Sequence, residues 1–134
     1  WNYKTQKLTR QLCDLNTFVL CSVFIKPQNY IAFGDTNGII KVVDVESGSI
    51  MFNLIGHKGR INSLTSLADG EYLASASEDK TIRIWGLKNG SHLIKLSGHE
   101  HKVSSVITLD DQVRLVSNSW DKTLKFWSSF ATEQ

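Results

Sequence analysis

A repeat with a period of 42 residues constrains this chain more than any other feature of its sequence. The stretch Asp79–Trp85 returns as Asp121–Trp127, and the pair Gly56-His57 returns as Gly98-His99, both at that spacing. Counted from the Gly-His pair to the Trp, 12 of 30 positions are identical in the two copies and no gap is needed. A period of this length indicates a repeat architecture.

Short runs of alternating apolar residues predict an all-β chain. Apolar side chains alternate at Ile82 and Ile84 and again at Leu124 and Phe126, and turn residues recur roughly every 8–12 positions. The predicted strands are 18–25, 30–34, 39–43 and 49–55, then 60–67, 72–76, 81–85 and 92–97, and finally 102–109, 114–118 and 123–127.

The same period organises the rest of the chain. Trp127 corresponds to Trp85, then to Val43 and then to Trp1, which predicts repeats at 14–55, 56–97 and 98–134. Residues 1–13 are expected to hold the outer strand of a preceding or ring-closing unit, and the third repeat lacks its own outer strand. The first repeat keeps the strand pattern but departs from the recurring residues at Asp14, Leu15, Asn37 and Val43.

Composition is ordinary for a globular domain with one modest core, with 134 residues, 41% apolar and 21% charged. The net charge of +2 is too small to favour nucleic acid or an anionic membrane as the main partner. No apolar run reaches the roughly 18–20 residues that a membrane helix needs. Because no secretory leader is visible, we expect an intracellular protein, either cytoplasmic or nuclear.

The two cysteines, Cys13 and Cys21, have neither metal-ligand spacing nor a histidine pair nearby. Cys21 aligns with Ser63 and Ser105, which are inward strand positions, so we predict a small buried thiol. So few cysteines also fit a reducing compartment.

The Gly-His pair and the Asp…Trp stretch at this period resemble the WD40 β-propeller repeat. The resemblance covers essentially the whole chain, by residue matches in the second and third repeats and by strand pattern in the first. It implies blades of four antiparallel strands, here three WD40-type blades that are part of a larger ring or closed by association. It also implies a non-catalytic interaction scaffold, without a cofactor, that presents a loop face to protein or peptide partners.

The resemblance assigns a structural role to the recurring polar residues. In WD40 repeats a His, a Ser or Thr, an Asp and a Trp form a hydrogen-bonded set inside one blade. The corresponding sets here are His57, Ser75, Asp79 and Trp85, and His99, Ser117, Asp121 and Trp127. Ser77 and Ser119 are alternatives to Ser75 and Ser117. Such a set is physically reasonable because a buried indole N–H and a buried carboxylate both need partners.

Two chemical alternatives are disfavoured. A Ser-His-Asp hydrolase triad would not be expected twice at one period, each copy ending on a Trp, and no Gly-x-Ser-x-Gly turn is present. A metal site could use His99 and His101, but His57 and His92 do not complete a convincing set. We predict no catalytic and no metal-binding residue, and an enzyme built on a propeller remains the least favoured alternative.

Candidate partner-binding residues lie on the loops that the resemblance places on one contact face. The position before the turn Asp holds Thr36, Glu78 and Trp120, and Trp is enriched in binding hot spots. The alternative for Trp120 is packing over its neighbouring blade. The full candidate set is Trp120, Glu78, Arg60, Lys102, Asn62 and Lys58. Its basic members suit an acidic or phosphorylated peptide, although a solvated charged rim is the more common outcome.

Three blades do not close a propeller ring, which has roughly 4–8. Because open strand edges and apolar faces favour association, two arrangements are expected. Either the remaining blades of a larger propeller are partners of this segment, or two copies of the chain exchange strands. A bulky second residue is a poor context for removal of the initiator Met, so Trp1 is expected not to be a native start and the chain to be a fragment.

Overall fold

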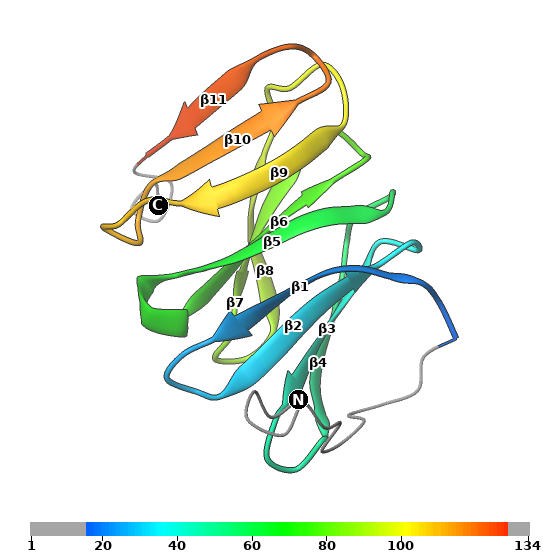
Figure 1. Ribbon diagram of the computed structural model, residues 1–134, viewed down its shortest axis with the longest axis vertical. Helices are drawn as coiled ribbons and strands as arrows, with labels where there is room; N and C mark the ends of the chain where they lie inside the picture. Colours follow the sequence, from blue (N-terminus) through cyan, green and yellow to red (C-terminus); the bar gives the residue numbers. More distant parts are fainter. Residues whose placement is uncertain (1–15, 129–134) are drawn as a thin grey trace, which may run out of the picture.

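The computed structural model describes residues 16–128, which form three antiparallel β-sheets and one short 3-10 turn, η1 (Ala68–Gly70) (Figure 1). The first sheet contains β1 (Val19–Ile25), β2 (Tyr30–Asp35), β3 (Ile39–Asp44) and β4 (Ile50–Ile55). The second contains β5 (Ile61–Leu67), β6 (Tyr72–Ser77), β7 (Ile82–Gly86) and β8 (Ser91–Leu96). The third contains β9 (Val103–Thr108), β10 (Leu115–Ser119) and β11 (Leu124–Trp127).

The all-β prediction is confirmed, and every strand end lies within one residue of its predicted position. Strands pair in chain order within each sheet, because short turns join consecutive antiparallel strands. The outer strand predicted within residues 1–13, together with Cys13, Asp14 and Leu15, lies outside the described residues. Within residues 16–128 no helix has the length and apolar character to span a membrane.

Two apolar seams join the sheets. One lies between the first and second sheets and the other between the second and third, and β1, β5 and β9 run side by side along them (Figure 1). A line of hydrogen bonds reinforces the second seam. Thr65 Oγ1 lies 2.8 Å from Thr108 Oγ1, and Ser63 Oγ accepts the Val106 N–H at 3.2 Å. Polar side chains of adjacent first strands are thereby satisfied across the seam.

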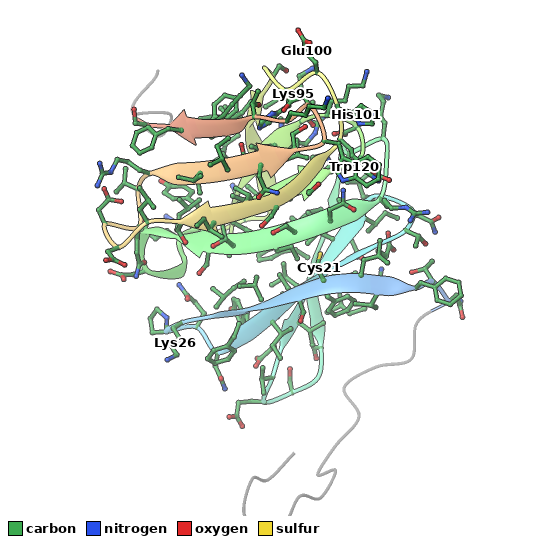
Figure 2. All side chains as sticks on the ribbon, turned by 45° about the horizontal axis from the view of Figure 1, so that its top comes forward. Cys21, Lys26, Lys95, Glu100, His101 and Trp120 are labelled. Atoms are coloured by element: carbon green, nitrogen blue, oxygen red, sulfur yellow. The ribbon has the colours of Figure 1, made fainter. Side chains whose placement is uncertain are left out.

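Cys21 lies at the first seam, between β1 and β5 (Figure 2). Its thiol is 3.6 Å from the carbonyl oxygen of Ile61, so the side chain points toward the neighbouring sheet. It is half-buried rather than buried as predicted. Burial raises the pKa of this thiol above its ordinary value.

At Gly34 the first sheet approaches the second closely. A Cβ atom built on Gly34 would lie 2.4 Å from Cβ and Cγ2 of Ile61. We expect Gly34→Ala to lower the free energy of unfolding by about 1–3 kcal/mol, because a buried seam has no room for the added methyl group. Chemical denaturation measures this change. The control is Gly86→Ala, where the nearest atom to a new Cβ is Leu93 Cδ1 at an ordinary 3.4 Å. An equal loss for both variants would contradict the packing argument.

Candidate functional site

Ser75 in β6 is the centre of a buried hydrogen-bonded set in the second sheet. Its Oγ lies 2.6 Å from His57 Nε2 and accepts the Trp85 Nε1–H at 2.8 Å. His57 Nδ1 in turn lies 2.8 Å from Asp79 Oδ2. These distances are consistent with one continuous chain of hydrogen bonds, from the indole through the hydroxyl and the imidazole to the carboxylate.

The third sheet repeats the arrangement one period later. Ser117 Oγ accepts the Trp127 Nε1–H at 2.8 Å and lies 2.7 Å from His99 Nε2. His99 Nδ1 lies 2.7 Å from Asp121 Oδ2. The alternative serines make other bonds: Ser77 Oγ donates to the Gly59 carbonyl at 3.0 Å, and Ser119 Oγ donates to the His101 carbonyl at 3.1 Å.

Asp79 also holds the turn between β6 and β7. Its Oδ1 accepts both the N–H and the Oγ1–H of Thr81, and its Oδ2 accepts the Lys58 N–H at 3.0 Å. Lys80, which lies between Asp79 and Thr81 in the turn, has a left-handed backbone conformation with a φ of 75°. This conformation is uncommon for a residue with a side chain. The Asp79 hydrogen bonds brace this turn and connect it to the loop that carries His57.

The pKa values of Asp79 and Asp121 lie well below the usual range for aspartate. Burial alone would raise the pKa of Asp79, but hydrogen bonds from His57, Thr81 and the Lys58 amide outweigh it. For Asp121 burial is likewise outweighed, by hydrogen bonds from Thr123, His99 and backbone amides. Both carboxylates are therefore ionised at neutral pH.

The sets are composed like a hydrolase triad but are closed to substrate. Ser75 and Ser117 are each 0% exposed, and each Oγ already accepts an indole N–H. A substrate carbonyl cannot reach a hydroxyl buried in this way, so neither serine can act as a nucleophile. The arrangement is suited to holding a blade together.

In the first sheet, the turn between β2 and β3 is held by Asp35, a residue that the repeat alignment does not single out. Phe33 stands where Ser75 stands one repeat later, and Asn37 stands where Asp79 stands. Asp35, only 4% exposed, instead accepts the N–H groups of Asn37 and Ile39 at 2.8 and 3.0 Å. The signal in the sequence is an Asp two residues before Asn-Gly, which is typical of a side-chain-capped turn.

Trp120 lies at the β10–β11 turn, next to His101 (Figure 2). This turn, the β6–β7 turn and the loops that precede β5 and β9 are called the rim below. The Trp120 side chain is 62% exposed. Lys102 Nζ lies 3.5 Å from the centroid of the Trp120 ring, and the His101 ring stacks on it at 5.9 Å. Both of these ring contacts come from Trp120's own repeat.

Glu78 connects the second and third sheets on the same rim. Its Oε1 lies 3.6 Å from Lys102 Nζ and 3.9 Å from Arg60 Nε. Asn62 Nδ2 donates to Glu78 Oε2 at 3.4 Å and to the Val103 carbonyl at 2.9 Å. Five of the six candidates are thus brought together. The sixth candidate, Lys58, is exposed on the loop before β5, and its backbone N–H donates to Asp79, the residue after Glu78.

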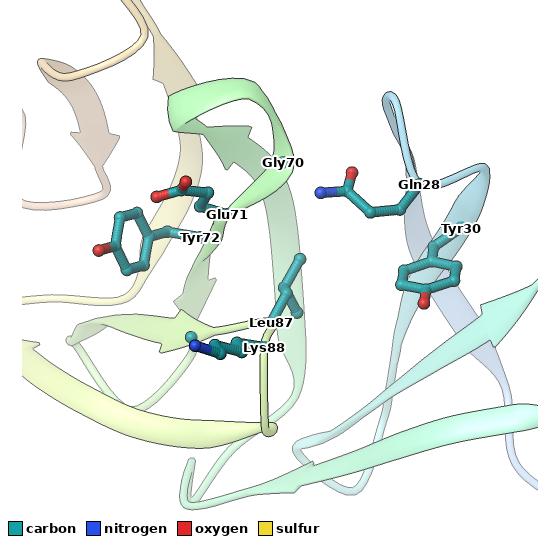
Figure 3. A pocket seen from close by; sticks show the side chains of 8 residues that line it. Gln28, Tyr30, Gly70, Glu71, Tyr72, Leu87 and Lys88 are labelled. Atoms are coloured by element: carbon teal, nitrogen blue, oxygen red, sulfur yellow. The ribbon is translucent and has the colours of Figure 1, made fainter.

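A cleft of about 560 Å³ opens at the other end of the strands, between the first and second sheets (Figure 3). Gln28 points toward Gly70, whereas Glu71 and Tyr72 point away from Gln28. The polar groups do not converge on one point, so the rim is the better candidate for recognition. Across residues 16–128, no group of three or more His, Cys, Asp and Glu side chains is gathered as a metal site would require.

The family model described as "WD domain, G-beta repeat" matches residues 48–86 and 90–128. The chain is 38% identical over 60 residues to WD repeat-containing protein SL1-17 of Schistosoma mansoni, covering 45% of this chain and 20% of that protein. It is 34% identical over 59 residues to apoptotic protease-activating factor 1 of Mus musculus, covering 44% of this chain and 5% of that protein. A solved structure, "Structure of U3-55K", matches with a TM-score of 0.84 and 27% identity over 90% of this chain and 38% of that one. The chain therefore spans a fifth or less of the curated relatives it matches.

Proposed function

This chain belongs to the WD40 (WD domain, G-beta repeat) family, whose members are generally protein-interaction scaffolds, and from that premise we propose that it is a non-catalytic scaffold binding a protein or peptide partner. The observation that carries the proposal is Trp120, 62% exposed on a rim turn. An aromatic side chain this exposed makes a strong anchor once a partner covers it.

Trp120 is also held in place before any partner arrives. Its backbone N–H donates to the Lys102 carbonyl at 3.1 Å, and the Lys102 ammonium lies over its ring. A side chain already fixed in this way loses little conformational freedom on binding. We place the centre of the partner's footprint on Trp120, with Glu78, Arg60, Lys102 and Asn62 around it.

A second candidate function is the reading of an acidic or phosphorylated peptide. It is favoured by the Arg60 side chain, which is 54% exposed and whose one carboxylate neighbour within residues 16–128, Glu78, lies as far as 3.9 Å from Nε. Lys58, exposed and without an ion pair among the described residues, adds a further cation to the edge. A guanidinium with free donors can take an external carboxylate or phosphate.

The face of the third sheet that points away from the second sheet is a candidate surface for a further class of partner. Leu124 and Phe126 are 74% and 57% exposed there. One repeat earlier, Ile82 and Ile84 occupy the same positions and are 0% and 2% exposed, because the third sheet packs against them. We propose that another blade covers Leu124 and Phe126 in the same way, supplied by the remaining blades of a larger propeller or by a second copy of this chain.

The scaffold proposal is tested by Trp120→Ala. We expect the apparent affinity for a partner captured from cell extract to fall by about tenfold or more, because the variant removes the anchor. Quantitative capture over a range of partner concentrations measures the change. Lys122→Ala is the control, since it alters an exposed residue of the same turn. Partner binding undiminished in Trp120→Ala rejects this residue as the anchor.

A further inference from the structure

Two cations and one amide converge on the Glu78 carboxylate at the boundary between the second and third repeats. Arg60 and Lys102 approach Oε1, and Asn62 approaches Oε2. Arg60 and Asn62 belong to the second repeat and Lys102 to the third. Within residues 16–128, no carboxylate other than Glu78 lies within 4.0 Å of either cation. The rim therefore contains a formed carboxylate site that one of its own side chains fills.

We propose that Glu78 is an internal occupant of this site, and that an acidic side chain of the partner takes its place between Arg60 and Lys102. The inference rests on the proposed function and specifies the partner: a peptide segment with an acidic residue beside an apolar one. The apolar residue covers Trp120. Glu78 is then the specificity-determining residue of the rim.

The weakness of the present contacts favours exchange. Both ion pairs are longer than a charge-assisted hydrogen bond, and the side chains of Arg60 and Glu78 are 54% and 27% exposed. The Lys102 side chain is 27% exposed as well, so solvent reaches every member of the two pairs. Solvent-screened pairs at these distances contribute little stability, so releasing Glu78 costs little. A partner carboxylate can instead take both donors of the Arg60 fork.

Lys102 connects the acidic subsite to the apolar one. Its ammonium lies 3.6 Å from Glu78 Oε1 and 3.5 Å from the Trp120 ring centroid. An anion held by Lys102 is therefore placed beside the indole, so one short peptide can occupy both subsites. Until it is displaced, Glu78 repels incoming anions, which disfavours extended polyanions that offer no apolar group.

The test uses the full-length protein and a fluorescein-labelled peptide in which glutamates flank a single phenylalanine. We expect Glu78→Gln to bind this probe about three- to tenfold more tightly than the wild type, because the internal competitor is gone while the side-chain shape is kept. The matched control is Glu100→Gln. Glu100 lies exposed on the same rim and makes no ion pair among the described residues, so its affinity change should stay below about twofold. Fluorescence anisotropy gives the affinities, and adding Arg60→Ala to Glu78→Gln should abolish the gain.

Four results would overturn the assignment. Equal tightening in Glu78→Gln and Glu100→Gln would reduce the effect to net charge. Weaker binding in Glu78→Gln, with preference for a lysine-containing probe, would make Glu78 a direct contact for a basic partner. Absence of probe binding in every variant would exclude the site. If Glu78→Gln tightened binding of an oligouridylate as much as binding of the peptide, the effect would be unspecific attraction of polyanions. If Glu78→Gln behaves as expected while Trp120→Ala leaves partner capture intact, the anion site stands and the scaffold anchor falls.

Discussion

Trp85→Ala is expected to lower the free energy of unfolding by about 3–5 kcal/mol. Trp85 is 1% exposed and packs in the seam between the first and second sheets. Its loss leaves a large cavity there and takes the indole donor away from Ser75 Oγ, which is itself fully buried. Equilibrium denaturation by urea measures the change.

The control for Trp85→Ala is the same chemical substitution at Trp120. Because Trp120 is 62% exposed, its removal should change the free energy of unfolding by no more than about 0.5 kcal/mol. The pair also separates the two roles assigned to tryptophan here, since only Trp120→Ala should impair partner binding in a folded protein. Equal stability losses in the two variants would contradict the assignment of Trp85 to the core.

Asp79→Ala is expected to lower the free energy of unfolding at neutral pH by about 1–3 kcal/mol. The substitution removes the acceptor for His57 Nδ1, for the Thr81 N–H and for the Lys58 N–H, and leaves the left-handed turn at Lys80 without its brace. Asp110→Ala is the control, because Asp110 lies exposed in another turn. A midpoint of thermal unfolding unchanged within error in Asp79→Ala would exclude this role.

The same carboxylate gives the stability a predictable dependence on pH. The folded-state pKa of Asp79 is lowered relative to an unfolded value of about 3.9, so its contribution is present above that pH. As the pH falls below about 4 toward the folded pKa, the contribution is lost. The wild type should therefore lose stability over this acid range more steeply than Asp79→Ala, and the two curves should converge at low pH.

Local patterns made most of the fold predictable from the sequence. Strand ends follow from alternating apolar residues and turn residues, both of which are properties of neighbouring positions. The gap-free period aligned His57, Ser75, Asp79 and Trp85 with their later copies, and the structure brings each set within hydrogen-bonding distance. The role of Asp35 in bracing its turn was not predicted, because the repeat alignment places the turn acid at position 37, where Asn37 stands.

Contacts between sheets were not predictable in the same way. The position of Glu78 between Arg60 and Lys102 depends on how two blades pack, and a period read along one chain does not give that geometry. The exposure of Cys21 has the same origin, because it is set by the distance between β1 and β5. The sequence identified which residues lie on the rim, but not which of them neutralise one another.

The two seams make this molecule quasi-one-dimensional in its folding. Each sheet is built from hairpins of consecutive strands, so its internal contacts join residues that are close in sequence. The free energy that couples one sheet to the next resides in the seams, through Thr65 with Thr108, Ser63 with Val106, and the close approach of Gly34 to Ile61. In such an array, nearest-neighbour coupling decides whether blades melt together or one at a time. The seams therefore govern cooperativity, whereas the buried Ser-His-Asp-Trp sets stabilise the second and third sheets individually.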